Sequence, residues 1–298
     1  MKQILKFLNS KSHWIMLSPY LLLFTVFIIV PIISAVGLSF TQFNAIQFPR
    51  FTGIQNYVRL LTLDSVFMQH VLPNTIEYAL VVGPGGYVLS FLLAWILAQI
   101  TKVNRTVLAI IIYSPSLTAG IIMTTVWRVI FSGDQLGYFN SILMRMDLIT
   151  EPIQWLQSPA HLMSLIMIIA LWSSMGVGFL AMLAGILNVN EELYEAAYID
   201  GVKNRFQEII YVTIPSMKPQ MLFGAVMAIV ATFSTGGIGI ALSGSNPTPL
   251  YSGQVIVNHI EDYGFIRFEM GYAAALSVVL LFIIWGASKV AWSLFSES

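Results

Sequence analysis

The sequence is poor in charged residues and contains no cysteine. Only 9% of its 298 residues are charged, whereas an average soluble domain has about 25%. Because 57% of the residues are hydrophobic and the mean hydropathy is +0.80, too few polar side chains are available to cover a water-soluble fold. We therefore expect a membrane protein and exclude soluble enzymes and disordered proteins. The absence of cysteine excludes disulfides and thiolate metal sites.

The sequence also gives no sign of nucleic-acid binding, a metal site or catalysis. Lysine and arginine total 14, as do aspartate and glutamate, so no basic excess can neutralise a phosphate backbone. The pair Glu261-Asp262 has no general acid nearby, which favours a solvated face over a catalytic dyad. We predict no catalytic residue and no metal ligand, since the four histidines share no ligand spacing: His13, His70, His161 and His259.

Long stretches without Asp, Glu, Lys or Arg occur along the whole chain. A helix needs about 20 mostly apolar residues to cross the hydrocarbon core of a bilayer. Strict alternation of apolar and polar residues, typical of a transmembrane strand, is absent. We predict an all-α membrane protein, a single transmembrane domain over 1–298, with spans at about 14–40, 78–101, 106–130, 162–187, 219–242 and 270–292.

The distribution of positive charge predicts the orientation of these spans. With the N-terminus inside, nine of the 14 lysines and arginines, including all seven lysines, lie in cytoplasmic segments. Because cytoplasmic loops carry an excess of lysine and arginine, this orientation is favoured over its reverse. We expect a multi-pass protein of the cell membrane with both termini in the cytoplasm.

The second span contains the sequence Gly83-Pro84-Gly85-Gly86. Glycine and proline are common in membrane helices, so ordinary composition is one explanation. The cluster is dense enough to favour a kinked or broken helix that lines a pathway.

Segment 188–218 differs from the rest of the chain because it holds eight of the 28 charged side chains. Asn188 with Glu191 three residues later is typical of a capping box, and Asp200-Gly201 predicts a turn. We predict two helices joined by a turn on the cytoplasmic face, with a small-residue surface that another protein can approach closely; a solvated helical loop is the alternative. The second helix is indicated by apolar spacing at Phe206, Ile209, Ile210 and Thr213.

Within this segment, Glu195-Ala196-Ala197, Gly201 and Val212-Thr213-Ile214-Pro215 resemble the EAA motif of ABC importer permeases. That motif reads EAA, three residues, Gly, nine residues and I-x-L-P. Nearly the whole chain is similar to the type I ABC importer permeases of the carbohydrate group, in particular the shorter maltose-type and glycerol-phosphate-type subunits. The other stretches that carry the resemblance are Ser18-Pro19-Tyr20 through Pro31 to Thr41, Phe51-Thr52-Gly53-Ile54-Gln55-Asn56-Tyr57 with Asn74-Thr75, and Phe268-Glu269-Met270-Gly271-Tyr272-Ala273-Ala274-Ala275.

The resemblance implies that 188–218, between spans 4 and 5, is a coupling segment that docks on a cytoplasmic ATPase. Such importers contain two permeases, often different chains that form a heterodimer, two ATPase subunits and an extracytoplasmic binding protein, and they work by alternating access. ATP and Mg would be bound by the ATPase, since this chain has no G-x-x-x-x-G-K-[ST] phosphate loop and is not expected to be an enzyme. The residues implied in coupling are Glu195, Ala196, Ala197, Asp200, Gly201 and Pro215.

A substrate site near the middle of the membrane is expected for alternating access. Sugars need hydroxyl partners and aromatic faces, and two spans offer both in stretches that resemble the sugar-site regions of the maltose-type permease. This chain has hydroxyls where that permease has several amides, and tight helix packing by small residues is an equally simple explanation. The predicted substrate-pathway residues are Trp172, Ser173 and Ser174 in the fourth span and Phe233, Ser234 and Thr235 in the fifth.

The resemblance favours an oligosaccharide as substrate, before a monosaccharide, a polyol or glycerol phosphate. The alternative function is a stand-alone secondary transporter of a small polar solute. Ion-coupled carriers normally place a carboxylate deep in a span. Apart from Glu77 at a boundary, none of the six predicted cores contains one.

The predicted orientation can be tested by labelling single cysteines in this cysteine-free chain. Cysteines at Asn9, Asn204 and Ser296 should resist a membrane-impermeant thiol reagent in intact cells and react after permeabilisation, whereas one at Ser158 should react in both. Labelling of Asn204→Cys in intact cells would show that the orientation is reversed.

Overall fold

The computed structural model describes residues 12–118 and 120–295, in which helices account for all regular structure except one two-stranded sheet. Lys2, Lys6 and Lys11, used in predicting the orientation, lie outside the described residues. The chain divides into two compact units. Unit 1 contains the residues up to Leu63 together with Ile260–Val279, and unit 2 contains Asp64–His259 together with the residues from Leu280 on.

Unit 1 begins with one continuous helical run whose central turn is π-helical. No residue in the most apolar part of this run is buried within the chain. The run therefore presents an apolar surface on all sides. Its elements are α2 (Ser12–Phe24), η1 (Thr25–Ile29), α3 (Val30–Leu38), the antiparallel strands β1 (Thr41–Gln42) and β2 (Arg50–Phe51), α4 (Gln55–Thr62), η5 (Asp262–Ile266) and the first part of α17 (Met270–Phe295).

Polar contacts in unit 1 join two stretches that are far apart in sequence. The Asn56 side chain donates hydrogen bonds to the carbonyls of Ser39 and Thr41, at 2.8 and 2.9 Å. Arg59 forms an ion pair with Glu269, and its guanidinium lies 4.4 Å from the ring centre of Tyr272. The FTGIQNY and FEMGYAAA stretches, recognised separately in the sequence, are therefore parts of one packed structure.

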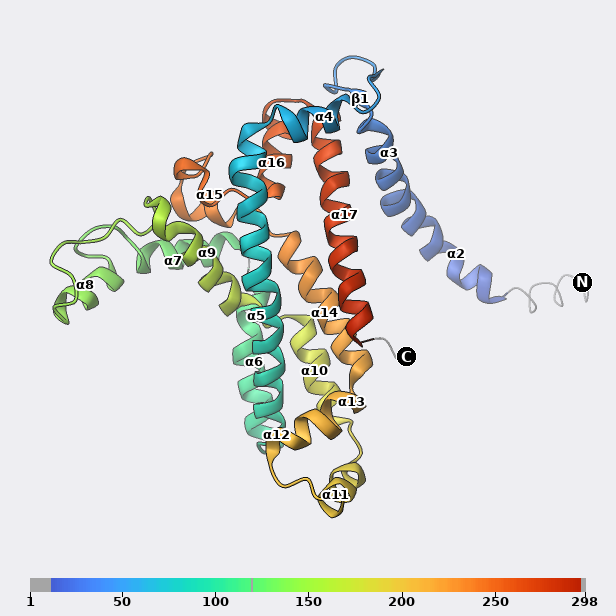
Figure 1. Ribbon diagram of the computed structural model, residues 1–298, viewed down its shortest axis with the longest axis vertical. Coiled ribbons are helices and arrows are strands. Elements are labelled where there is room, and N and C mark those ends of the chain that lie inside the picture. Colours follow the sequence, from blue (N-terminus) through green and yellow to red (C-terminus); the bar gives the residue numbers. More distant parts are fainter. Residues whose placement is uncertain (1–11, 119, 296–298) are drawn as a thin grey trace, which may run out of the picture. The chain divides into compact units, whose positions relative to one another are not determined.

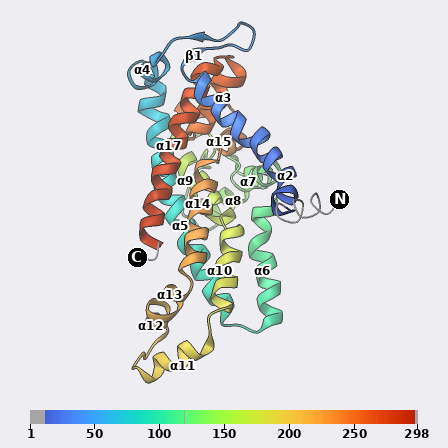
Figure 2. The same ribbon diagram turned by 90° about the vertical axis from the view of Figure 1, so that its right-hand side faces the viewer.

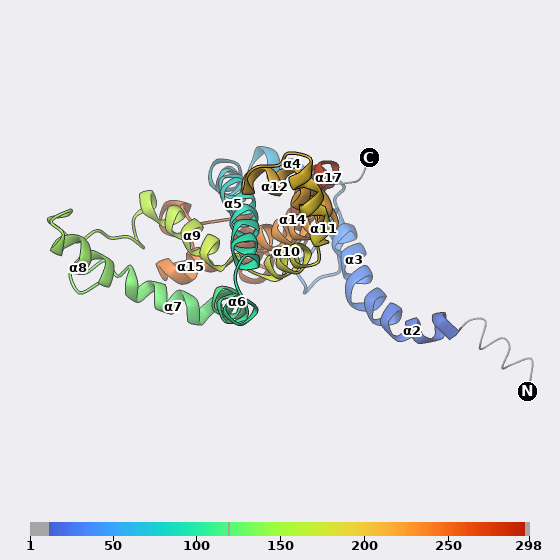
Figure 3. The same ribbon diagram turned by 90° about the horizontal axis from the view of Figure 1, so that it is seen from below.

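Unit 2 is built around the long helix α5, which packs against α9, α10 and α14. In Figures 1 and 2, α11 and α12 lie beyond the lower ends of α10 and α14, and Figure 3 views the unit from that end. The elements are η2 (Phe67–Val71), α5 (Leu72–Ala98), α6 (Lys102–Leu117), α7 (Gly120–Ile130), α8 (Tyr138–Arg145), α9 (Pro159–Ser173), α10 (Val177–Leu187), α11 (Glu191–Ile199), α12 (Arg205–Glu208), η3 (Ile209–Thr213), α13 (Ile214–Ser216), α14 (Lys218–Phe233), α15 (Ile238–Ser243) and η4 (Pro249–Tyr251), together with most of α16 (Ile256–Glu261) and the last part of α17.

Among the described residues, three helices are long and apolar enough to cross a membrane: Met16–Leu38, Phe67–Ala98 and Met270–Phe295. Three helix pairs pass the same test only as bent spans. Their bends are 96° between Lys102–Leu117 and Ile122–Ile130, 41° between Pro159–Ser173 and Val177–Leu187, and 86° between Arg205–Ser216 and Lys218–Phe233. The prediction of an all-α membrane protein is confirmed, and six spans result if each bent pair is one span.

Three predicted spans differ from the helices observed. The span over 162–187 is interrupted, because α9 ends at Ser173 and α10 starts at Val177. A single helix over 219–242 is wrong, because α14 ends at Phe233 and α15 starts at Ile238. Gly237 between them has a φ of +76°, which no α-helix can include. The span predicted over 106–130 is not one continuous helix, since α6 ends before Thr118, whose backbone is extended.

Of the kinked or broken helix predicted at the Gly83-Pro84-Gly85-Gly86 cluster, the broken form is wrong. Helix α5 runs without interruption from Leu72 to Ala98 and includes Pro84. Its glycines instead allow close packing. A Cβ on Gly86 would lie 2.9 Å from the Ser174 side chain, and one on Gly85 would lie 3.0 Å from that of Leu171.

The turn between α5 and α6 is held by Arg105. Its guanidinium donates three hydrogen bonds to carbonyls at the end of α5: to Leu97 at 3.1 Å, Ala98 at 3.1 Å and Ile100 at 2.8 Å. The last carbonyls of a helix have no partner within the helix, and a positive charge there also interacts favourably with the helix dipole.

We expect Arg105→Ala to lower the free energy of unfolding by about 1–3 kcal/mol, because it leaves these carbonyls without their charged donor. Thermal unfolding of the purified protein in detergent measures the loss. Lys102→Ala, at an exposed position in the same turn, is the control and should leave the melting temperature unchanged. Equal melting temperatures for the two variants would contradict a capping role for Arg105.

Candidate functional site

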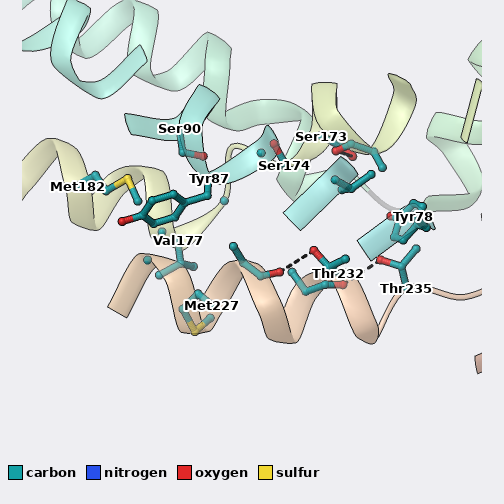
Figure 4. Close-up of a pocket in the computed structure, with 18 of the residues that line it drawn as sticks. Tyr78, Tyr87, Ser90, Ser173, Ser174, Val177, Met182, Met227, Thr232 and Thr235 are labelled. Atoms are coloured by element: carbon teal, nitrogen blue, oxygen red, sulfur yellow. Dashed lines mark hydrogen bonds between the residues drawn. The ribbon is translucent and has the colours of Figure 1, made fainter. Parts of the chain in front are cut away.

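A cavity of about 300 Å³ lies among α5, α9, α10 and α14 in unit 2 (Figure 4). This volume is at the lower end of the range for small-molecule sites. None of the described residues that line it is charged. Its polar side chains are tyrosine, serine and threonine hydroxyls: Tyr78, Tyr87, Ser90, Ser173, Ser174, Thr232 and Thr235.

The serines and threonines of the cavity mostly donate their hydroxyl hydrogen to a carbonyl of their own helix. Ser174 donates to Leu171 at 2.7 Å, Thr232 to Ala228 at 2.7 Å and Thr235 to Ala231 at 2.9 Å. A hydroxyl that donates in this way keeps its oxygen lone pairs as acceptors. The cavity is therefore equipped to accept hydrogen bonds from an uncharged ligand that is rich in hydroxyl groups.

Three of the six predicted pathway residues line the cavity: Ser173, Ser174 and Thr235. Trp172, Phe233 and Ser234 are not among the lining residues. Trp172 is 44% exposed and meets Trp127 edge-on, with ring centres 5.4 Å apart. Ser234 is exposed at the C-terminal cap of α14.

Helix α5 contributes a polar wall that the sequence analysis did not identify. Tyr78, Tyr87 and Ser90 all come from this helix. In Figure 4, Tyr87 and Ser90 lie across from Met227, and Tyr78 lies beside Thr235. Gly86, which also lines the cavity, is the residue from which this wall could have been predicted. A glycine between two tyrosines in a span indicates that another helix approaches closely there.

The predicted coupling segment contains the two helices and the turn that the sequence predicts, but the expected capping box is wrong. Helix α11 begins at Glu191, and its N-cap is Asn190 rather than Asn188. The side-chain Oδ1 of Asn190 accepts a hydrogen bond from the backbone amide of Glu192 at 3.1 Å. Asn188 instead follows the end of α10. Glu191 and Glu192 occupy the first turn of α11, where acidic side chains favour the helix dipole.

The EAA residues lie on α11, and the turn that follows depends on glycine. Glu195 and Ala196 are exposed, whereas Ala197 is half-buried. Asp200 is the C-cap of α11, and Gly201 has a φ of +98°, in the region that other residues resist. The space around Gly201 is open, so backbone conformation alone explains why glycine is needed there.

The second spacing of the EAA motif is not kept. Ten residues, 202 to 211, separate Gly201 from Val212, one more than the nine of the family pattern. Downstream of the turn, the helix contains the π turn η3 (Ile209–Thr213), with Pro215 at the start of α13. A π turn accommodates one extra residue in a helix.

Three residues that the sequence analysis did not single out connect α11 to the helix after the turn. The Tyr194 hydroxyl lies 3.0 Å from the Thr213 hydroxyl. The Tyr198 hydroxyl donates to Glu208 Oε1, and Arg205 donates to Glu208 Oε2 at 2.8 Å. The hydrogen bond to Glu208 raises the pKa of the Tyr198 hydroxyl above its usual value. Glu208 is only 3% exposed, so these two donors compensate a buried carboxylate.

No group of three or more histidine, aspartate or glutamate side chains suited to a metal ion occurs within residues 12–118 and 120–295.

Comparison with known proteins identifies the family. A family model described as "Binding-protein-dependent transport system inner membrane component" matches residues 86–289. The arabinooligosaccharides transport system permease protein AraP of Bacillus subtilis (strain 168) is 30% identical, over 96% of this chain and 89% of its own. The lactose transport system permease protein LacF of Rhizobium radiobacter is 28% identical, over 92% of this chain and 90% of its own.

Solved structures support the fold. One chain in the crystal structure of a bacterial ABC transporter involved in the import of the acidic polysaccharide alginate superposes with a TM-score of 0.78. The match covers 99% of this chain and 100% of the other chain. Because the two are only 23% identical, the likeness shows the fold alone. Together with the family match, it confirms the predicted type I ABC importer permease fold. The chain thus belongs to the binding-protein-dependent transport system inner membrane components, and it is a multi-pass membrane permease.

Proposed function

We propose that this permease carries an uncharged sugar, an oligosaccharide in particular, across the cell membrane by alternating access. The observation that supports this substrate class is the cavity lined by hydroxyls and tyrosines. Two of the similar permeases are named for arabinooligosaccharides and lactose, which are substrates of the same chemistry. A second permease would supply the other wall of the pathway.

The lining of the cavity disfavours glycerol phosphate as the substrate and a stand-alone secondary transporter as the function. Glycerol phosphate would need a cationic side chain or a cluster of amide donors, and none of the described lining residues is lysine or arginine. A stand-alone secondary transporter would need an ionisable coupling group such as a carboxylate, and none of the described lining residues is aspartate or glutamate.

Segment 188–218 is proposed to dock on one of two cytoplasmic ATPase subunits, which bind ATP and Mg. Helix α11 offers the acidic Glu195 beside exposed apolar side chains, with Leu193 47% and Ile199 87% exposed. Exposed apolar area next to a charge is typical of protein interfaces. The complete importer would also contain a different second permease and an extracytoplasmic binding protein, with both termini of this chain in the cytoplasm.

Removal of cavity hydroxyls should weaken sugar uptake. Thr232→Val and Thr235→Val each remove one acceptor with little change in shape, and we expect the sugar concentration for half-maximal uptake to rise about five-fold for each. Uptake into proteoliposomes that contain the complete importer measures this. Thr106→Val is the matched control, because Thr106 on α6 donates to the carbonyl of Lys102 in the same way but is exposed outside the cavity.

Unchanged uptake by both cavity variants would show that the hydroxyls serve helix packing only. A loss of assembled importer in both variants, with normal assembly of Thr106→Val, would lead to the same conclusion.

Disruption of α11 should abolish coupling while the permease remains in the membrane. Glu195→Lys reverses the charge of the docking surface, and the loss of one partner of a buried charge pair typically weakens binding by about 2–5 kcal/mol. Gly201→Pro cannot adopt the φ of +98° that the turn requires. We expect both variants to lose transport and substrate-stimulated ATP hydrolysis, whereas Glu151→Lys, at an exposed position distant in sequence, retains them. Normal transport by both would contradict docking through α11.

A further inference from the structure

The two tyrosines that attach α11 to the following helix lie on one face of α11. Tyr194 and Tyr198 are four residues apart, so their side chains point to the same side of the helix. Each reaches a buried partner: Thr213 is 1% exposed and Glu208 is 3% exposed. Tyr198 is itself 49% exposed, but because both partners are buried the contact differs from a pairing of surface side chains, which would be worth little. We call the contact of Tyr194 and Tyr198 with Thr213 and Glu208 the joint.

The joint has one charged component at its centre. Both oxygens of the Glu208 carboxylate are used, one by Tyr198 and the other by Arg205. Separation of α11 from Glu208 would leave Arg205 in place but take the Tyr198 donor from one oxygen of a buried carboxylate, so the structure resists it. The Thr213 hydroxyl also bonds to the Glu208 carbonyl, at 3.3 Å, which links the two tyrosine contacts to each other.

The joint is continuous with the helix that lines the cavity. Glu208 and Thr213 belong to the helical run Arg205–Ser216, which meets Lys218–Phe233 at a bend of 86°. Met217 at this bend is completely buried in a cluster that includes Phe179 and Met182 of α10. Farther along, α14 carries Thr232 into the cavity. A chain of packed contacts thus leads from α11 to the cavity.

We propose that Tyr194, Tyr198 and Glu208 form a positioning joint that makes α11 and Arg205–Ser216 move as one body. Movement imposed on α11 by the ATPase then reaches α14, and the cavity opens or closes in step with ATP. This inference rests on the proposed docking of α11 to an ATPase. In this proposal the joint transmits movement, whereas the exposed surface that includes Glu195 binds the ATPase.

The test uses the complete importer in proteoliposomes, with ATP hydrolysis and sugar uptake measured on the same preparation. Tyr194→Phe/Tyr198→Phe removes both hydroxyls and keeps both rings, and Glu208→Gln keeps the side-chain size but leaves a single acceptor oxygen. We expect the ATPase subunits to co-purify and to hydrolyse ATP, while the amount of sugar transported per ATP falls at least about five-fold. Tyr211→Phe removes a hydroxyl from an exposed ring on η3 and should leave this ratio unchanged.

An unchanged ratio of sugar to ATP in both joint variants would overturn the proposal. Loss of the ATPase subunits from these variants would overturn it as well, because the tyrosines would then build the docking surface rather than transmit its movement. Absence of ATPase subunits from the wild-type complex would instead refute the proposed docking, so the two failures are distinguishable.

A distance measurement tests the rigidity of the joint independently of transport. Glu191→Cys on α11 and Ser216→Cys at the end of the following run are exposed sites for spin labels in this cysteine-free chain. We expect one narrow distance distribution that is the same with and without ATP. The distribution should broaden when Tyr194→Phe/Tyr198→Phe is added. A distance in the otherwise unaltered chain that shifts on addition of ATP would show that α11 moves separately, and would exclude the joint.

Discussion

The close approach of α5, α10 and α14 is the constraint on which the rest of unit 2 depends. A Cβ on Gly178 of α10 would lie 3.3 Å from the backbone of Gly224 on α14, and one on Gly86 of α5 would lie still closer, 2.9 Å, to the Ser174 side chain. Apolar side chains gain little by leaving lipid for a helix interface, so membrane helices associate through small residues that bring backbones together. Because these residues are small, the same packing leaves the cavity beside them.

Polar side chains inside such a bundle must be uncharged and already hydrogen-bonded, since a polar group without a partner in hydrocarbon is costly. The serine and threonine hydroxyls of the cavity meet this requirement by donating to carbonyls of their own helices. They remain acceptors without introducing charge. A solute that carries many hydroxyl donors is therefore the ligand for which such a lining is suited, whereas an ion would find no counter-charge among the described lining residues.

Features encoded by local sequence could be predicted, and features that depend on helix rotation could not. Hydrophobic length predicted helical spans, and the Asp200-Gly201 turn was predicted because only glycine accepts its backbone conformation readily. Whether Ser174 or Trp172 faces the cavity depends instead on how α9 is rotated about its axis against its neighbours. The N-cap was misplaced by two residues because Asn188 and Asn190 are both good caps, and the end of α10 decides between them.

The joint between α11 and the next helix is a tertiary feature of the same kind. Tyr198 and Glu208 are ten residues apart and lie on either side of a turn whose geometry is set by Gly201. Helical periodicity places Tyr194 and Tyr198 on one face of α11, but it does not show what that face meets. A buried carboxylate at this position costs free energy unless it is paired. Because of that cost, the segment has one preferred arrangement, which a solvated loop would lack. With this fixed arrangement, a movement of α11 is transmitted to α14.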